Sequence, residues 1–153
     1  MAPSFELTAS DGRKISSEGL RGQKNLVLYF YPADFTPVCT KETCGFRDAY
    51  QELSGQDTEV VGVSVDSTES HARFAEKYNV PFPLVSDEDQ ELARKFGVNQ
   101  GLLGKLHGLM GNTRRVTFVI DKTGTIAAIF AAELSANAHL DGAREAVARL
   151  AGR

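Results

Sequence analysis

The only two cysteines of the chain, Cys39 and Cys44, lie in one short segment. Thr36 is a favourable helix N-cap and Pro37 a favourable first helical residue, so a helix is predicted to begin here with Cys39 in its first turn. Unpaired backbone N–H groups and the helix dipole favour an anion at that position, and helix starts are among the sites that lower the pKa of a cysteine. Because the thiolate is the reactive form, the segment indicates a nucleophilic cysteine rather than a buried free thiol, which is the common alternative.

The five-residue spacing limits what the two thiols can do together. On an ideal helix, five residues rise about 7.5 Å and turn about 140°, which leaves the two Cα atoms roughly 8–9 Å apart. A disulfide requires Cα atoms within about 7 Å of each other. If the two cysteines bond, the first turns of the helix must therefore unwind, and oxidation becomes a conformational change. A zinc site is less favoured, because structural zinc usually takes four Cys or His ligands and no histidine is near this pair in sequence.

The bulk composition is that of a globular protein, with 153 residues, 42% hydrophobic, 24% charged and a net charge of −3. This length fits one domain, residues 1–153. No apolar run approaches the roughly 20 residues that cross a bilayer, and the start lacks the features of a secretory signal, so we expect no membrane contact and a cytoplasmic location. No basic block exceeds the pair Arg114 and Arg115, which argues against a nucleic-acid partner. In a reducing cytosol, a close cysteine pair favours catalytic or redox chemistry over a structural disulfide.

The hydrophobic pattern predicts the elements that position this segment. Strand-forming runs are expected at residues 25–31, 60–65, 116–120 and 125–130, the last two forming a hairpin, with a small extra hairpin from residues 5–8 and 14–16. Helices are expected between them, from apolar residues three and four apart around residues 46–53, 74–78 and 92–96 and in a last helix over 140–150. Ser67 is a predicted N-cap, Asp87 and Gln90 have capping-box spacing, and Gly97 is a predicted helix stop.

The order of these elements predicts an α/β fold. Helical crossovers between the early strands imply parallel pairing, and the late hairpin adds antiparallel pairing. We therefore expect a mixed central β-sheet of the thioredoxin-like type, flanked by helices on both faces, with a small N-terminal hairpin. The cysteine segment leaves the carboxyl end of a buried strand, where open α/β sheets tend to place their sites.

The same segment resembles the active site of the peroxiredoxins, whose Pro-x-x-x-Thr-x-x-Cys signature matches Pro32, Thr36 and Cys39. The Cys-x-x-x-x-Cys spacing is similar to that of the bacterioferritin-comigratory (Q-type) subfamily. Further on, residues 115–121 resemble the family's Arg-x-Ser/Thr-Phe strand, and residues 86–89 and 96–98 also fit the pattern. Val38 stands where this subfamily usually has glycine, and residues 99–114, rich in Gly and Leu, do not match closely.

The resemblance implies a role for each matching residue. Cys39 is expected to attack a peroxide, and Cys44 to resolve the sulfenic acid as an intramolecular disulfide, with simple helix packing as the alternative for Cys44. Thr36 and Arg115 are expected to align the peroxide, while Pro32 and Val38 border the substrate site. Thr36 can equally be only a cap, and Arg115 only a strand-flanking charge. Glu42, one turn after Cys39, either orients the arginine or is a solvated acid.

The resemblance also implies what the protein works with. Hydrogen peroxide and organic hydroperoxides are the expected substrates, thioredoxin or glutaredoxin the expected reductant, and a monomer or weak dimer the expected state. No metal or other cofactor is expected, because sulfur performs the chemistry. His71, His107 and His139 are predicted to be non-catalytic, and the apolar stretch 102–110 is predicted to be a packing or contact surface.

Three other functions remain open at this level. A general thiol–disulfide oxidoreductase would normally carry Cys-x-x-Cys, which this chain lacks. A redox sensor would use the same unwinding to change partners, but would oxidise once instead of turning over. A structural disulfide would persist in mild reductant and form no sulfenic acid.

Overall fold

The computed structural model describes residues 3–31, 34, 37–97, 115–131 and 136–151 and, within these ranges, all side chains except those of residues 37–39, 136–138 and 151. Pro32, Thr36 and His107 lie outside the described residues, as do the side chains of Val38 and Cys39. The elements in chain order are β1 (Glu6–Thr8), β2 (Lys14–Ser16), α1 (Ser17–Leu20), β3 (Asn25–Phe30), α2 (Pro37–Ser54), β4 (Thr58–Ser64), α3 (Thr68–Tyr78), β5 (Leu84–Ser86), α4 (Glu91–Lys95), β6 (Val116–Ile120), β7 (Ile126–Phe130) and α6 (Ala136–Ala151).

The main sheet is mixed, as predicted, with strand order β5-β4-β3-β6-β7. Strand β3 pairs in parallel with β4, which pairs in parallel with β5, because α2 and α3 cross over between them. Strands β6 and β7 form the predicted antiparallel hairpin, and β6 is also antiparallel to β3. The small hairpin β1-β2 forms a separate two-stranded sheet. The fold is therefore the thioredoxin-like arrangement that the element order predicts.

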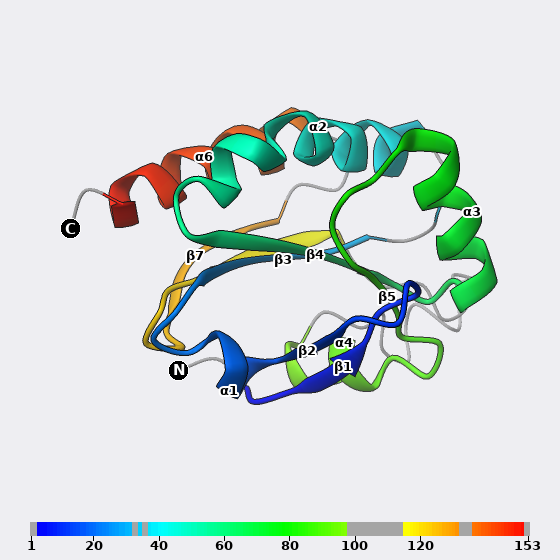
Figure 1. Cartoon of the computed structure of the whole chain (residues 1–153), viewed down its shortest axis with the longest axis horizontal. Helices are drawn as coiled ribbons and strands as arrows, with labels where there is room; N and C mark the ends of the chain where they lie inside the picture. The colour runs from blue at the N-terminus through cyan, green and yellow to red at the C-terminus, as the bar shows by residue number, and fades with distance from the viewer. Residues whose placement is uncertain (1–2, 32–33, 35–36, 98–114, 132–135, 152–153) are drawn as a thin grey trace.

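Each face of the sheet is covered by its own set of elements, as Figure 1 shows. Alternate residues of a strand point to opposite faces, so β3 contributes to two separate apolar clusters. Leu26, Leu28 and Phe30 pack with the β1-β2 hairpin and α4. Val27 and Tyr29 pack with α2, α3 and α6. The central strand is therefore buried on both faces, as its continuous apolar run predicts.

Two short elements lack a sequence signal. Strand β5 has three residues and follows Pro81 and Pro83, which interrupt any strand-like pattern. Helix α1 has four residues and is capped by Ser16, whose Oγ accepts a hydrogen bond from the N–H of Gly19 at 3.0 Å. Both elements depend on their neighbours more than on their own residues.

The predicted capping box at α4 is wrong in its details. Gln90 occupies the N-cap in a left-handed conformation, with φ of 57°, and makes no side-chain cap hydrogen bond. Asp87 instead accepts hydrogen bonds from the N–H groups of Leu92 at 3.0 Å and Ala93 at 2.9 Å. The predicted caps at Ser67 and Gly97 are confirmed, since Ser67 accepts from Ser70 and Gly97 has a φ of 73°.

Gly62 lets the sheet hold the cysteine-bearing helix. It lies opposite Tyr29 in the β3-β4 pairing, and a Cβ atom at position 62 would lie 2.7 Å from the Tyr29 ring. The ring therefore occupies the space that a side chain would fill, and its hydroxyl is 2.9 Å from Thr43 Oγ1 in α2. This hydrogen bond fixes the first half of α2 against the sheet.

Among the helices that the structure describes, none combines the length and the apolarity needed to cross a membrane.

Candidate active site

The helix that carries both cysteines begins at Pro37, directly after the connection from the carboxyl end of β3. Cys39 is therefore the third residue of α2, as predicted, with its backbone in the turn where N–H groups lack helical partners. Cys44 follows in the same helix as a half-buried free thiol. The interpretation of the two residues as members of one helix is confirmed.

Arg115 reaches this helix from a distant part of the chain. It directly precedes β6, whose first residue pairs with Phe30 at the end of β3, so the antiparallel pairing places the start of β6 beside the end of β3. Arg115 is only 4% exposed, and its Nη1 donates a hydrogen bond to Glu42 Oε1 at 3.2 Å. The guanidinium is thus buried against the first turns of α2.

Glu42 is fully buried, so its interpretation as a solvated acid is wrong. It lies three residues after Cys39, and positions three apart share one face of a helix. The ion pair with Arg115 therefore lies on the helix face that includes position 39. Removing one member of a buried ion pair leaves an uncompensated charge, which makes each partner dependent on the other.

His139 joins this cluster, and the sequence reading did not identify it. The residue is fully buried in α6, and its Nδ1 is 2.7 Å from Thr117 Oγ1 and 3.4 Å from Glu42 Oε2. A signal was present, because His139 lies four residues before Ala143 and thus on the apolar stripe of the last helix. Thr117 faces the same side of β6 as Arg115, since alternate strand residues share a side. Helix α6 therefore contributes a titratable group to the surroundings of Glu42.

A second polar cluster surrounds Asp34, which lies in the connection between β3 and α2. Asp34, at 7% exposure, accepts hydrogen bonds from Tyr31 Oη at 2.6 Å and Ser70 Oγ at 2.9 Å. The fully buried His71 places its Nδ1 at 2.8 Å from Asp34 Oδ2. Burial, together with Asp34, raises the pKa of the Tyr31 hydroxyl well above its ordinary value. This cluster ties the connection to α3, which the sequence pattern did not predict.

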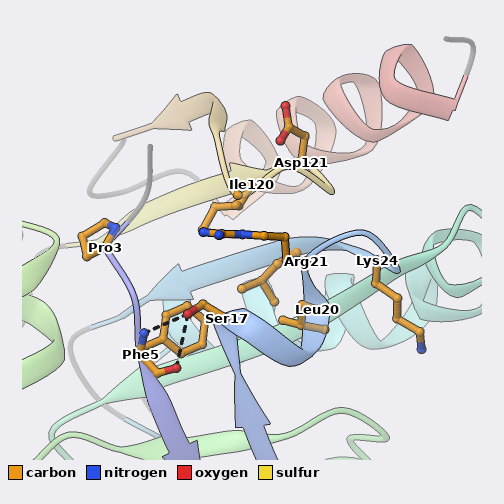
Figure 2. A pocket seen from close by; sticks show the side chains of 10 residues that line it. Pro3, Phe5, Ser17, Leu20, Arg21, Lys24, Ile120 and Asp121 are labelled. Atoms are coloured by element: carbon orange, nitrogen blue, oxygen red, sulfur yellow. Dashed lines mark hydrogen bonds between the residues drawn. The ribbon is translucent and has the colours of Figure 1, made fainter.

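Figure 2 shows a pocket at the opposite end of the sheet. It is lined by residues such as Leu26 at the start of β3 and Ile120 at the end of β6, and it has a volume of about 20 Å³. That volume holds about one water molecule. The side chain of Arg21 lies beside it, and Ser17 Oγ is hydrogen bonded to the backbone of Phe5. The pocket is therefore remote from both cysteines.

Within the described ranges, no three His, Cys, Asp or Glu side chains are grouped so that they could hold a metal ion.

Comparisons with known proteins agree with this geometry. Residues 1–129 match the model of the AhpC/TSA family. A relative, the chloroplastic peroxiredoxin Q of Sedum lineare, is 42% identical over 139 residues, which cover 91% of this chain and 71% of that protein. The chain spans 60–71% of the length of the plant peroxiredoxin Q proteins that it matches.

Solved structures extend the likeness to the whole fold. Peroxidoxin BcpB of Mycobacterium tuberculosis is 37% identical, with a TM-score of 0.87 over 97% of this chain and 94% of that one. The bacterioferritin comigratory protein of Xanthomonas campestris, whose structures concern its alkyl peroxide reduction activity, is 31% identical, with a TM-score of 0.83 over 96% of this chain and 92% of that one.

A thioredoxin-like sheet with a cysteine in the first turn of its first crossover helix is the architecture of a thiol-dependent enzyme. The chain belongs to the AhpC/TSA family and, within it, to the group of the peroxiredoxin Q and bacterioferritin comigratory proteins. Its activity is accordingly that of a thiol-dependent peroxidase.

Proposed function

We propose that Cys39 is the nucleophile of this peroxidase and that Cys44 resolves the product. The observation that carries the proposal is the position of Cys39 as third residue of α2, one turn before the buried Glu42–Arg115 pair. The helix start and the nearby guanidinium both favour a thiolate at this position. The substrates are hydrogen peroxide and organic hydroperoxides, in line with the alkyl peroxide reduction by the Xanthomonas campestris relative.

In the first step, the Cys39 thiolate attacks one oxygen of the peroxide. The S–O bond forms as the O–O bond breaks, and the other oxygen leaves as an alkoxide or hydroxide that takes up a proton. Arg115 stabilises the charge that develops on the leaving oxygen, with Glu42 fixing the direction of the guanidinium. The Thr36 hydroxyl donates a hydrogen bond to the bound peroxide. Pro32 and Val38 border the substrate and limit its contact with water. Cys39 is left as a sulfenic acid.

In the second step, the start of α2 unwinds and Cys44 attacks the Cys39 sulfur. Water leaves, and the Cys39–Cys44 disulfide forms. A dithiol protein, thioredoxin or glutaredoxin, then reduces the disulfide to two thiols and is itself oxidised to a disulfide. We propose that the whole chain, residues 1–153, acts as one such domain, as a monomer or weak dimer. The cycle suits the cytoplasm, where reduced dithiol proteins are available for antioxidant defence.

The decisive experiment measures peroxide consumption by the wild type, Cys39→Ser and Cys44→Ser, coupled to thioredoxin, its reductase and NADPH. We expect multiple turnovers for the wild type and none for Cys39→Ser. For Cys44→Ser we expect one turnover, with a sulfenic acid at Cys39 that a diketone probe traps and mass spectrometry locates.

Two results would contradict the proposal. Peroxide consumption that survives in Cys39→Ser would exclude Cys39 as the nucleophile. A wild type that is oxidised once and is not reduced by either thioredoxin or glutaredoxin would exclude the recycling step. Repeating the assay with hydrogen peroxide and with an alkyl hydroperoxide tests the substrate range.

A further inference from the structure

Asp34 is held by more contacts than its place in a connection between two elements requires. Its backbone N–H donates to Asp66 Oδ2 at 2.7 Å, beyond the end of β4. Its carboxylate accepts from Tyr31 and Ser70, and the His71 ring is 2.8 Å away. The Asp34 side chain is fully buried. Because an isolated buried carboxylate is costly, an ionised Asp34 needs a partner of opposite charge.

Both ring nitrogens of His71 face oxygen atoms at hydrogen-bond distance. Its Nδ1 faces the Asp34 carboxylate at 2.8 Å, and its Nε2 is 3.0 Å from the carbonyl oxygen of Val85 in β5. A carbonyl oxygen only accepts, and so does an ionised carboxylate, so an ionised Asp34 makes both ring nitrogens donors. A neutral imidazole carries only one N–H. These contacts link the β3-α2 connection to α3 and β5, and they form a buried ion pair when Asp34 is ionised and His71 carries both ring protons.

A hydrolytic site does not explain this arrangement. Ser64 Oγ is 3.5 Å from His71 Nε2, which gives a Ser, His, Asp order like that of a catalytic triad. However, Ser64 and His71 are both 0% exposed, and Ser64 donates its hydroxyl to Asp66 at 2.6 Å. A substrate has no access to this serine, and its proton is already engaged.

We propose that the Asp34–His71 ion pair is a positioning unit that holds the connection between β3 and α2 so that Cys39 can meet a peroxide. The proposal rests on the proposed function, because it takes Cys39 as the nucleophile. Asp34 lies five residues before Cys39, and among the side chains that the structure describes, the next polar contacts given along the chain are those of Glu42 with Arg115 and Thr43 with Tyr29. The cysteine thus lies on a segment that is fixed at both ends.

This arrangement affects the two chemical steps differently. Attack on the peroxide needs the thiolate in one geometry, and a displacement of about 1 Å can reduce such a rate by about a hundredfold. Disulfide formation needs the start of α2 to leave that geometry. Loss of the ion pair is therefore expected to slow the first step and to leave the second unchanged or faster. A residue that merely stabilises the fold would not separate the two steps.

The state of His71 can be tested first in the unmodified wild type. Long-range ¹H–¹⁵N spectra of the ¹⁵N-labelled, reduced protein at neutral pH distinguish an imidazolium from each neutral tautomer. We expect the His71 ring to carry protons on both nitrogens. A neutral His71 ring in the wild type would overturn the proposal, whatever the variants do.

The kinetic test uses Asp34→Asn and His71→Gln, which remove one charge each. Stopped-flow competition gives the second-order rate with peroxide, and quenched-flow thiol labelling gives the rate of disulfide closure. For each variant we expect the first rate to fall at least about tenfold and the second to stay or rise. If either variant fails to fold, the other variant and the wild-type spectrum still decide the question.

Asp87→Asn is the matched control, because Asp87 is a buried carboxylate at 6% exposure, close to the 7% of Asp34, and the hydrogen bonds described for its side chain come from the start of α4. It is expected to lower stability without changing the ratio of the two rates. Equal slowing of both steps in the Asp34 and His71 variants would assign the pair a purely structural role. Failure of the proposed function would show separately, as activity that survives in Cys39→Ser.

Discussion

In the candidate active site, the buried carboxylate of Glu42 balances the charge of Arg115. Its carboxylate lies 3.2 Å from the Arg115 guanidinium and 3.4 Å from the His139 ring, and no part of its side chain is exposed. Without Glu42, Arg115 loses a compensating charge and an acceptor that directs one of its N–H groups. In the mechanism we propose, Glu42 therefore acts on the reaction through Arg115.

Glu42→Gln keeps the size of the side chain and removes its charge. We expect the second-order rate with peroxide to fall by about tenfold or more. The loss of one hydrogen-bond donor that stabilises transition-state charge costs at least that much, and Arg115 would be misdirected in this variant. We also expect the free energy of unfolding to fall by about 3 kcal/mol, the usual cost of breaking a buried pair. Competition kinetics and urea unfolding measure the two effects.

Glu52→Gln is the control on the same helix. Glu52 pairs with Arg144 at 2.9 Å, but about half of each side chain is exposed. Exposed pairs contribute about 0–1 kcal/mol, so this variant should react like the wild type. Equal behaviour of the two variants would show that the Glu42 charge has no special role.

At the scale of elements, α2 depends on the strand beneath it. Tyr29 links β3 to Thr43 through a hydrogen bond, and its ring fits only because position 62 in β4 has no side chain. The stability of the cysteine-bearing helix is therefore coupled to a glycine in the strand next to β3.

Gly62→Ala tests this coupling. A methyl group would collide with the Tyr29 ring and with Leu84, and overpacking of this kind costs about 1–3 kcal/mol. We expect a lower urea midpoint and faster hydrogen exchange in the first half of α2. Gly55→Ala, where the added atom would have only ordinary contacts from 3.4 Å upward, should change neither. Unaltered exchange in α2 of a folded Gly62→Ala protein would contradict the coupling.

Helix α4 depends in the same way on Asp87. Its carboxylate accepts from two N–H groups of the first turn, and an asparagine offers only one accepting oxygen. We expect Asp87→Asn to lower the free energy of unfolding by about 1 kcal/mol, as for a lost N-cap. Gln90→Ala, which removes a side chain that makes no cap hydrogen bond, should cost less than Asp87→Asn in the same urea titration.

The sequence predicts those elements whose signal is local. The long strands are predictable because each is a run of apolar and β-branched residues, and the start of α2 because Pro37 favours a first helical position. Strand β5 was not predictable, because its three residues form a strand only by pairing with β4. Asp87 caps α4 as predicted, but not through the predicted capping box, because the left-handed turn at Gln90 shifts its hydrogen bonds to the N–H groups of Leu92 and Ala93.

The residues of the candidate site also fall into two groups, those with a local sequence signal and those without one. Cys39 and Cys44 are found from local spacing, and Arg115 from its resemblance to a family motif. The contacts of His139 with Glu42 and of Asp34 with His71 depend on how α6 and α3 pack on the sheet, and no local pattern encodes that packing. Long-range polar contacts are therefore the part of the site that only the structure reveals.

At the scale of the whole molecule, a fully buried and a half-buried tyrosine, Tyr31 and Tyr50, limit stability at alkaline pH. Partial burial and the hydrogen bond to Glu59 raise the pKa of Tyr50 to about 12, from an ordinary value of 10.0. The pKa of Tyr31 is also raised, as described above. Both groups keep their protons in the folded state while the unfolded chain loses them. Their contribution to stability is complete below pH 10 and is lost as pH rises toward 12.

We therefore expect the free energy of unfolding to decrease steadily above about pH 10, as the unfolded chain releases more protons than the folded protein. Urea titrations between pH 8 and pH 11.5 measure this decrease, with absorbance at 295 nm following tyrosine ionisation. Tyr50→Phe should make the decrease shallower. An identical pH dependence in the variant and the wild type would show that Tyr50 does not contribute.

The contact between Glu42 and Arg115 joins residues 73 apart in the chain, and it needs β6 to be in place beside β3. A ribosome releases the cysteine segment long before it has made the arginine. During that interval the nascent chain holds the thiol without the guanidinium that we place beside it. In the mechanism we propose, the full reactivity of Cys39 toward peroxide therefore requires the completed sheet, and an incomplete or misassembled chain is expected to be oxidised more slowly than the folded enzyme.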